Sequence, residues 1–292
     1  MRKKPKFGKI AIIGLGLMGA SLGLALKKGG LATEVAGFAR KSKTRRNALS
    51  KKIVDIACGR IEYAVRDAEL VVICAPVGAI PDLARKCVPM MRKNAAITDV
   101  GSSKGKIIAE TEKIFAEGDV KFVGSHPIAG SEQQGLEAAR PDLYRNAVVA
   151  VTPTKRTSQA ALRKVAAFWR SLGSSVVVLP PREHDRIMAR TSHLPHLIAA
   201  ALSACVGREK AEKYGMFCGS GFRDTTRIAE GDPQLWRDIV ADNAGFLRKE
   251  LKIFATELNK IISGLEKGKS DITEKYLRKG RDSRMKLLAV KR

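Results

Sequence analysis

Histidine and cysteine, the residues that most often build metal centres, are scarce in this sequence. Four His and five Cys occur among 292 residues, and the Cys residues are scattered without CxxC pairs or His partners at metal-ligand spacing. This pattern is typical of reduced thiols in a cytoplasmic protein, and it predicts no metal site. No run of about 18 apolar residues occurs, so we expect no membrane span. No apolar signal core follows the basic N-terminus.

Aromatic and acidic residues are also few. Aromatic residues make up 5% of the chain, and 29 Asp and Glu stand against 54 Lys and Arg, which gives a formal net charge of +25. Such an excess is typical of proteins that meet nucleic acids, anionic membranes or anionic small ligands. Because neither zinc-finger spacing nor an aromatic RNA-binding signature is visible, we favour a basic surface that attracts anionic small ligands over a nucleic-acid partner.

The order of apolar segments predicts two domains. Hydrophobic residues make up 45% of the chain, enough for a sizeable core. Short apolar runs alternate with helical segments in the first part of the sequence, at residues 9–13, 34–39, 69–76, 95–100, 122–123, 147–151 and 174–179. This alternation predicts a doubly wound, Rossmann-type parallel sheet in a dinucleotide-binding domain over residues 1–180. Residues 181–292 predict a helical domain, with long helices at 183–206 and 233–263 and a basic C-terminal tail.

A glycine-rich turn follows the first predicted strand and opens a helix. It consists of Gly14, Leu15, Gly16, Leu17, Met18 and Gly19. A GxGxxG pattern is weak alone and specific when it joins a strand to a helix. The first glycine permits the tight turn, the second lets a pyrophosphate approach the backbone, and the third lets the helix pack on the strand. The turn therefore predicts a dinucleotide whose phosphates lie at the helix N-terminus.

The end of the second predicted strand indicates which dinucleotide is preferred. An NAD-selective site places Asp or Glu there to hold the ribose 2′-hydroxyl, but this chain has Ala39 followed by Arg40, Lys41 and Ser42, and no acid occurs over residues 36–52. Arginine can hold a 2′-phosphate bidentately. We therefore expect NADP, with NAD as a possible second cofactor. Ala75 and Pro76, at the end of the strand 69–76, complete the predicted cofactor-binding set.

Polar residues that suit catalysis gather in segments expected at the sheet edge and in the helical domain. The turn-rich segment 124–130 after a predicted strand contains His126, and the segment 101–104 contains Ser102. His193 and His196 are three apart on one predicted helix face and lack a third metal ligand. One helical turn separates Arg223 from Arg227; one of them can clamp a carboxylate, while Asp224 or a helix C-terminus can hold the other.

Five motifs together give the chain a resemblance to a known family. GLGLMG, DVGSSK, GSHPIAGSEQQG, TSHLPH and GFRDTTRIAEGDPQLW occur in this order between about residues 9 and 265. The sequence resembles the prephenate/arogenate dehydrogenases of tyrosine biosynthesis, and the last three motifs together are specific. The resemblance implies a homodimer formed by the helical domain, with oxidative decarboxylation of a ring substrate and hydride transfer to NADP or NAD.

The resemblance also implies roles for individual residues. His126 accepts the proton of the ring hydroxyl, which its unperturbed pKa of about 6.5 suits, and Ser102 orients that hydroxyl. Arg223 pairs with a substrate carboxylate, while His193 and His196 line the helical wall. The same pattern places Glu132 near the pocket, where it gates entry or contacts Arg223.

Other readings stay open at this point. A β-hydroxyacid dehydrogenase or imine reductase shares the two-domain architecture but usually carries a Lys or Asp where this chain has TSHLPH. A non-catalytic NADP-binding sensor is a second alternative, and a nucleic-acid-binding module is a third. Prephenate and arogenate differ by a keto group and an ammonium, and Glu137 is a candidate partner for the ammonium.

Overall fold

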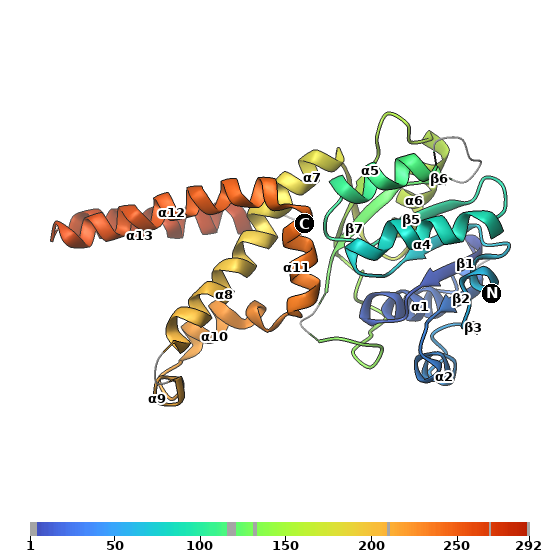
Figure 1. The fold of residues 1–292 in the computed structure, drawn as a ribbon, viewed down its shortest axis with the longest axis horizontal. Coiled ribbons are helices and arrows are strands. Elements are labelled where there is room, and N and C mark those ends of the chain that lie inside the picture. The colour runs from blue at the N-terminus through green and yellow to red at the C-terminus, as the bar shows by residue number, and fades with distance from the viewer. Residues whose placement is uncertain (1–4, 116–120, 131–132, 209–210, 269, 291–292) are drawn as a thin grey trace.

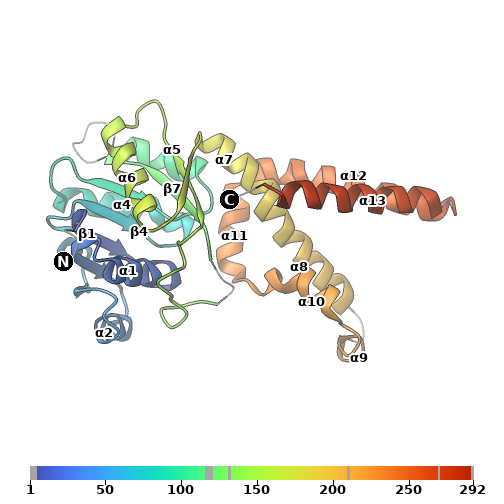
Figure 2. The same ribbon diagram turned by 180° about the vertical axis from the view of Figure 1, so that it is seen from behind.

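The computed structural model describes residues 5–115, 121–130, 133–208, 211–268 and 270–290. Figures 1 and 2 show a sheet domain covered by helices, joined at α7 to a set of extended helices that project away from it. The two longest of these helices, α12 and α13, run side by side in both views.

Within the described residues, the main sheet has six parallel strands in the order β3-β2-β1-β4-β5-β6. The strands are β1 (Phe7–Ile13), β2 (Ala32–Phe38), β3 (Ile56–Cys58), β4 (Leu70–Ile73), β5 (Ala96–Asp99) and β6 (Lys121–Phe122). The chain reverses its direction of winding between β1 and β4, which leaves a crevice at their carboxyl ends. The predicted fold class, a doubly wound parallel sheet followed by helices, is confirmed.

Hydrophobic layers cover both faces of this sheet. Successive side chains of each strand point to opposite faces, and the apolar strands therefore supply both layers. Ile10 and Ile12 of β1 face a cluster with Leu22 and Leu26 of α1, whereas Ala11 and Ile13 face the opposite cluster. The helices of this part are α1 (Leu17–Gly29), α2 (Ser42–Ser50), α3 (Ile61–Val65), α4 (Ile80–Cys87) and α5 (Gly105–Ile114), with short 3₁₀ turns η1 (Val77–Ala79) and η2 (Val88–Met90).

A separate three-stranded sheet follows the main one in the chain. It consists of β7 (Gly124–Ile128), β8 (Val148–Thr152) and β9 (Ser175–Val178), and α6 (Gln159–Ser171) lies between the last two strands. The prediction of one continuous sheet was wrong here, because β7 pairs antiparallel with β8 and not with β6. Gly, Ser and Pro give β7 little strand propensity of its own, and the valine-rich β8 supplies its hydrogen-bonding partner.

The remaining described residues are helical from Pro181 onward. The helices are α7 (Pro181–Met188), α8 (Leu194–Gly207), α9 (Ala211–Gly215), α10 (Ser220–Thr226), α11 (Pro233–Asp242), α12 (Ala244–Glu266) and α13 (Ser270–Leu288), with the 3₁₀ turn η4 (Arg227–Glu230). The predicted helix 183–206 contains a π-helical turn, Ala189–His193, just before Pro195. Proline lacks the N–H that continues a regular helix, which accounts for the local widening.

One expectation for the helical part needs correction. The predicted helix 233–263 is two helices that meet at Asn243, where the backbone leaves the helical region. The basic C-terminal tail is helix α13, which packs against α12. No helix in the described ranges is long and apolar enough to cross a membrane.

Candidate active site

The glycine-rich turn lies at the β1/β4 crevice and has the shape that a pyrophosphate requires. Gly14 has a φ of +102°, and a side chain there would collide with the Cys74 carbonyl oxygen at 2.3 Å. A side chain on Gly19 would collide with the Gly14 carbonyl oxygen at 1.9 Å. Gly16 precedes α1, and a Cβ added there would meet no described atom within 4 Å beyond its chain neighbours. This opening at a helix N-terminus is where an anion can meet free backbone N–H groups.

The residues between these glycines divide between core and crevice. Leu15 is buried in the core, and Leu17 and Met18 begin α1 half-buried. The Met18 carbonyl accepts a hydrogen bond of 2.7 Å from the Tyr144 hydroxyl. On the other side of the crevice Ala75 and Pro76 follow β4 after one intervening residue, Cys74. The predicted cofactor-binding residues of the glycine-rich turn and of the segment after β4 therefore lie at the adjoining ends of β1 and β4.

The basic segment after β2 forms the start of α2. Arg40 and Lys41 are exposed, and Ser42 is the first residue of the helix. Arg45, which sequence reasoning left unassigned, donates from Nη1 to the carbonyls of Ala39 at 2.8 Å and Arg40 at 2.7 Å. Its guanidinium therefore lies at the end of β2, where a dinucleotide's ribose is held in this type of fold.

His126 lies on strand β7, not on the loop that the sequence predicted. Its neighbours Ser125 and Pro127 pair with Val151 and Val149 of β8. The ring is largely buried, with 9% of the residue exposed, and Nδ1 lies 2.9 Å from Nε2 of His184 on α7. His126 is thus fixed by backbone pairing on one side and by the helical domain on the other.

A hydrogen-bonded series of three side chains, Asp185, His184 and His126, determines the tautomer of His126. Asp185 Oδ1 lies 2.8 Å from His184 Nδ1, and a carboxylate can only accept a hydrogen bond. His184 Nδ1 therefore carries the proton, its Nε2 accepts, and His126 Nδ1 must donate to it. This assignment, inferred from the hydrogen-bond partners, leaves a lone pair on Nε2 of His126. A neutral imidazole with a free Nε2 lone pair is a proton acceptor.

The pKa shifts of Asp185, His184 and His126 agree with this hydrogen-bonded series. Burial, followed by the charges of His184 and Lys104, holds the pKa of His126 well below its usual value. The pKa of His184 is also lowered, chiefly by burial. Burial raises the pKa of Asp185, but hydrogen bonds from His184, Gly105 and Lys104 outweigh it and keep that pKa low. The carboxylate is therefore charged and both imidazoles are neutral near pH 7.

A buried lysine and aspartate join the Ser102 segment to β7. Asp99 accepts hydrogen bonds from Gly101 N at 2.8 Å and from Ser125 N at 3.1 Å. Lys104 forms an ion pair with Asp99, and its Nζ donates to the Ser125 carbonyl at 2.9 Å. Ser102 lies half-buried between these anchors. Because the same two residues hold both segments, Ser102 and His126 belong to one rigid site.

The second predicted histidine presents a donor to this site. Nδ1 of His193 lies 3.1 Å from the Asn243 amide nitrogen, which also donates to the Asp185 carbonyl at 2.8 Å. His193 Nδ1 therefore accepts, and its Nε2 carries the proton. That Nε2 is buried and has no partner that meets full hydrogen-bond geometry in the described part of the chain, but the Ser102 backbone interacts with the same imidazole. Burial lowers the pKa of His193 to about 4.

A cavity of about 300 Å³ lies beside these histidines. His196 lines it with its ring stacked on Trp236 at 3.4 Å between centroids, and the edge of His193 meets the same indole at 6.1 Å. A side chain on Gly231 would collide with both rings of the stack. Arg227 lines the cavity as well.

Two predicted substrate contacts do not lie on this cavity. Arg223 is exposed, donates from Nε to the Cys218 carbonyl at 3.2 Å, and is not among the described residues of the cavity wall. Glu137 pairs instead with Lys51 and with Asn47 on α2. Glu132 lies outside the described residues. In the described ranges no cluster of His, Cys, Asp or Glu is arranged to hold a metal ion.

Comparison with known families assigns both parts of the chain. Residues 22–178 match the family profile described as prephenate dehydrogenase, nucleotide-binding domain. Residues 180–279 match the profile described as prephenate dehydrogenase, dimerization domain. The chain belongs to the prephenate dehydrogenase family. The resemblance seen in its motifs is thereby confirmed.

Individual members of the prephenate dehydrogenase family support the assignment over nearly the whole length. The chain is 32% identical to cyclohexadienyl dehydrogenase of Zymomonas mobilis, with 96% of each chain covered. Prephenate dehydrogenase from Aquifex aeolicus, solved with hydroxyphenyl propionate and NAD⁺, superposes with a TM-score of 0.90 at 30% identity over 98% of this chain and all of that one. Arogenate dehydrogenase from Synechocystis superposes with a TM-score of 0.81 at 29% identity, over 96% of this chain and 99% of that one.

Family membership decides between the alternatives left open by the sequence. The prephenate dehydrogenases are oxidoreductases, so the chain is an enzyme with a pyridine-nucleotide-binding domain. A β-hydroxyacid dehydrogenase and a non-catalytic sensor are disfavoured. The relatives include enzymes named prephenate dehydrogenase, arogenate dehydrogenase and cyclohexadienyl dehydrogenase.

Proposed function

We propose that this enzyme oxidises prephenate or arogenate at the ring carbon that bears the hydroxyl, with decarboxylation of the ring, and that His126 is the base. The observation that carries the proposal is the hydrogen-bonded series Asp185–His184–His126. It orients a neutral imidazole with its Nε2 lone pair available for the substrate.

The chemistry needs one proton acceptor and one hydride acceptor. A bound pyridine nucleotide supplies the hydride acceptor. His126 Nε2 takes the hydroxyl proton, so that the oxygen's electrons form a carbonyl as the hydride departs. The bond to the ring carboxylate then breaks, its electron pair enters the ring and passes to the carbonyl oxygen, and carbon dioxide leaves. The resulting phenolate takes the proton back from His126, which gives the aromatic phenol and restores the neutral base. Ser102 orients the hydroxyl by a hydrogen bond.

The substrate is recognised in the cavity beside His193 and His196. We assign the side-chain carboxylate of the substrate to Arg227 and not to Arg223, because Arg227 lines the cavity with His196 and Trp236. The guanidinium fork matches a carboxylate bidentately. His193 Nε2–H supplies a neutral donor at the cavity edge. His196, stacked on Trp236, forms a flat wall that suits a six-membered ring.

We further propose a preference for NADP over NAD. Arg40 and Arg45 bring positive charge to the end of β2, and a guanidinium has five N–H donors. Arg45 can therefore hold the loop and still donate to a 2′-phosphate. The absence of an acid over residues 36–52 removes the group that would repel that phosphate.

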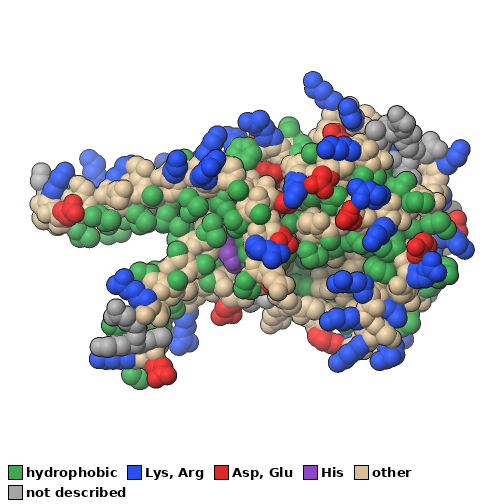
Figure 3. Space-filling view, in the orientation of Figure 1, with side chains coloured by type: hydrophobic (Ala, Val, Ile, Leu, Met, Phe, Trp, Pro, Cys, Tyr) green, Lys and Arg blue, Asp and Glu red, His purple; other side chains and the backbone are tan. Residues whose placement is uncertain are grey.

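The assembly proposed for this enzyme is a homodimer. The helical part matches a profile described as a dimerization domain. Figure 3 shows apolar side chains along one side of the α12–α13 hairpin. The exposed hydrophobic residues of α12 include Leu258, Ile262 and Leu265, whose spacing places them on one helix face.

Steady-state kinetics with prephenate and arogenate, each with NAD and NADP, test the proposed reaction. We expect turnover of at least one ring substrate, with release of carbon dioxide, and kcat/KM at least about tenfold higher with NADP. Arg45→Ala should reduce the NADP preference, whereas Arg46→Ala, one residue further along α2, serves as the control. Absence of turnover with either substrate would contradict the proposed function. An NAD preference would contradict only the cofactor assignment.

A further inference from the structure

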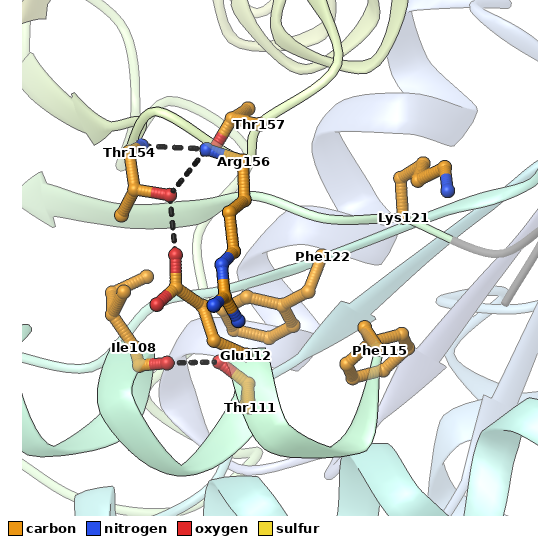
Figure 4. A pocket seen from close by; sticks show the side chains of 9 residues that line it. All are labelled: Ile108, Thr111, Glu112, Phe115, Lys121, Phe122, Thr154, Arg156 and Thr157. Atoms are coloured by element: carbon orange, nitrogen blue, oxygen red, sulfur yellow. Dashed lines mark hydrogen bonds between the residues drawn. The ribbon is translucent and has the colours of Figure 1, made fainter. Parts of the chain in front are cut away.

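A second cavity lies away from the proposed active site. It has a volume of about 520 Å³, within the usual range of small-molecule sites. Its walls come from the C-terminal half of α5, from β6 and from the loop between β8 and α6 (Figure 4). The other end of α5 begins at Gly105, which donates to Asp185 at 2.7 Å. The ten residues of α5 span about 15 Å, so the cavity is distinct from the His126 site.

The cavity combines a carboxylate, a guanidinium and two phenyl rings. Glu112 on α5 accepts a hydrogen bond from the Thr154 hydroxyl, and that hydroxyl accepts one from Arg156 N at 3.2 Å. These bonds tie the loop to the helix. The rings of Phe115 and Phe122 lie 5.8 Å apart between centroids and are tilted by 35°. Figure 4 shows the Arg156 side chain reaching from the loop toward Glu112 and Phe122.

Each of these groups selects one feature of a ligand. A carboxylate has about four lone-pair sites, so Glu112 can hold Thr154 and still accept from an ammonium. The Arg156 guanidinium matches a carboxylate. Two tilted phenyl rings at this spacing favour a flat apolar group against them. Both charge signs and an aromatic surface within one small cavity point to a ligand that carries both charges and a ring.

We propose that this cavity is a binding site for an aromatic amino acid. The ammonium pairs with Glu112, the carboxylate pairs with Arg156, and the ring packs on Phe115 and Phe122. The site is independent of the reaction proposed for His126, because no residue of its wall belongs to that site.

Calorimetric titration of the full chain with L-phenylalanine tests the site. This probe lacks the ring hydroxyl of the proposed reaction product. We expect Glu112→Gln and Arg156→Gln each to weaken binding at least about tenfold, since each loses a bond between charged groups. Lys113→Gln and Lys155→Gln, the exposed neighbours on the same helix and loop, should stay within about twofold.

Two fragment probes separate the three contacts. 3-Phenylpropionate lacks the ammonium and phenethylamine lacks the carboxylate, so each should bind at least about tenfold more weakly than L-phenylalanine. The proposal is wrong if no binding is measured, if neither cavity substitution weakens it, or if Arg227→Ala abolishes it. The kinetics without amino acid should be near wild type in both cavity variants, which separates this site from the proposed function.

Discussion

At the scale of single residues, His126 is the group on which the proposed chemistry depends. His126→Asn keeps a hydrogen-bonding side chain but cannot accept the proton. General bases typically contribute about 10²–10⁴-fold, so we expect kcat to fall at least about 10²-fold while the substrate KM changes much less. Rapid-mixing and steady-state assays at neutral pH measure this loss. A variant that keeps near-native kcat would show that another group is the base, with His193 the next to replace.

The structure corrects the pH dependence expected from the sequence. An unperturbed histidine would make the rate fall below about pH 6.5, but burial holds the pKa of His126 well below that value. The imidazole therefore stays neutral and able to accept a proton in mildly acidic solution. The acidic limb of kcat should lie clearly below about pH 6.5, and this limb should disappear in His126→Asn.

The two arginines of the segment 223–227 give a matched pair of variants. Both side chains are exposed, but Arg227 lines the cavity with His196, whereas Arg223 lies outside its described wall and donates to a backbone carbonyl. A substrate bound in the cavity would cover the Arg227 guanidinium, and loss of one partner of such a covered charge pair costs about 2–5 kcal/mol. We expect Arg227→Ala to raise the KM of the ring substrate by at least about thirtyfold, and Arg223→Ala to change it by less than about threefold. A larger KM increase in Arg223→Ala than in Arg227→Ala would show that Arg223 binds the substrate carboxylate.

Sequence patterns identified the residues that suit the chemistry of this site, but they did not identify the residues that support them. His126, Ser102 and His193 were found because they lie in motifs, and the structure brings their segments together. His184 and Asp185 were missed because they are adjacent in sequence and their partners lie about 60–80 residues away. Such contacts depend on how α7 docks on the sheet domain, which no local pattern reveals.

At the scale of elements, sequence patterns predicted the strands that are buried on both faces. Apolar runs such as those of β1 and β4 are unambiguous, and the glycine turn fixes the helix that follows. The pattern failed for β7, whose Gly, Ser, His and Pro read as a loop. It becomes a strand only because β8 pairs with it. Tertiary pairing here overrides local propensity, and it is what holds His126 in place.

Helix α7 provides the test of the tautomer argument, because it supplies both His184 and Asp185. Asp185→Asn keeps the size of the side chain but can donate a hydrogen bond, so His184 is no longer forced to protonate Nδ1. Loss of the correct tautomer behind a base can cost about 10²–10⁴-fold in rate. We expect kcat to fall by that order, with the cofactor KM nearly unchanged.

Asp185 also accepts from Lys104 N and Gly105 N, so Asp185→Asn is expected to lower stability as well. The pH profile separates the two effects, since a purely structural loss scales kcat equally at all pH values. Ser103→Ala, which removes a different contact between the two domains, is the control. A parallel, unshifted profile in Asp185→Asn would argue against the tautomer role.

At the scale of the whole molecule, the four histidines make folding sensitive to acid. All four are buried, and burial lowers the pKa of each. Below about pH 6.5 the unfolded chain binds protons that the folded chain does not, so stability falls as pH drops from there toward about 4. The loss approaches about 1.4 kcal/mol per pH unit for each histidine that stays neutral. Urea unfolding at about pH 7.5 and about pH 5 should show it, and equal midpoints would contradict it.

The projecting hairpin of α12 and α13 determines the proposed assembly. Leu258, Ile262 and Leu265 are 44%, 51% and 66% exposed on one face of α12, an apolar surface that is costly to leave in water. Stable dimers bury at least about 1,200 Å² in total, and a long hairpin offers that area to a second copy. Ile262→Asp places a charge on this face and should yield monomers by light scattering after size exclusion. Thr256→Asp adds the same charge on the opposite face of α12, where Thr256 is exposed, and should stay dimeric. A dimeric Ile262→Asp would show that the interface lies on another surface.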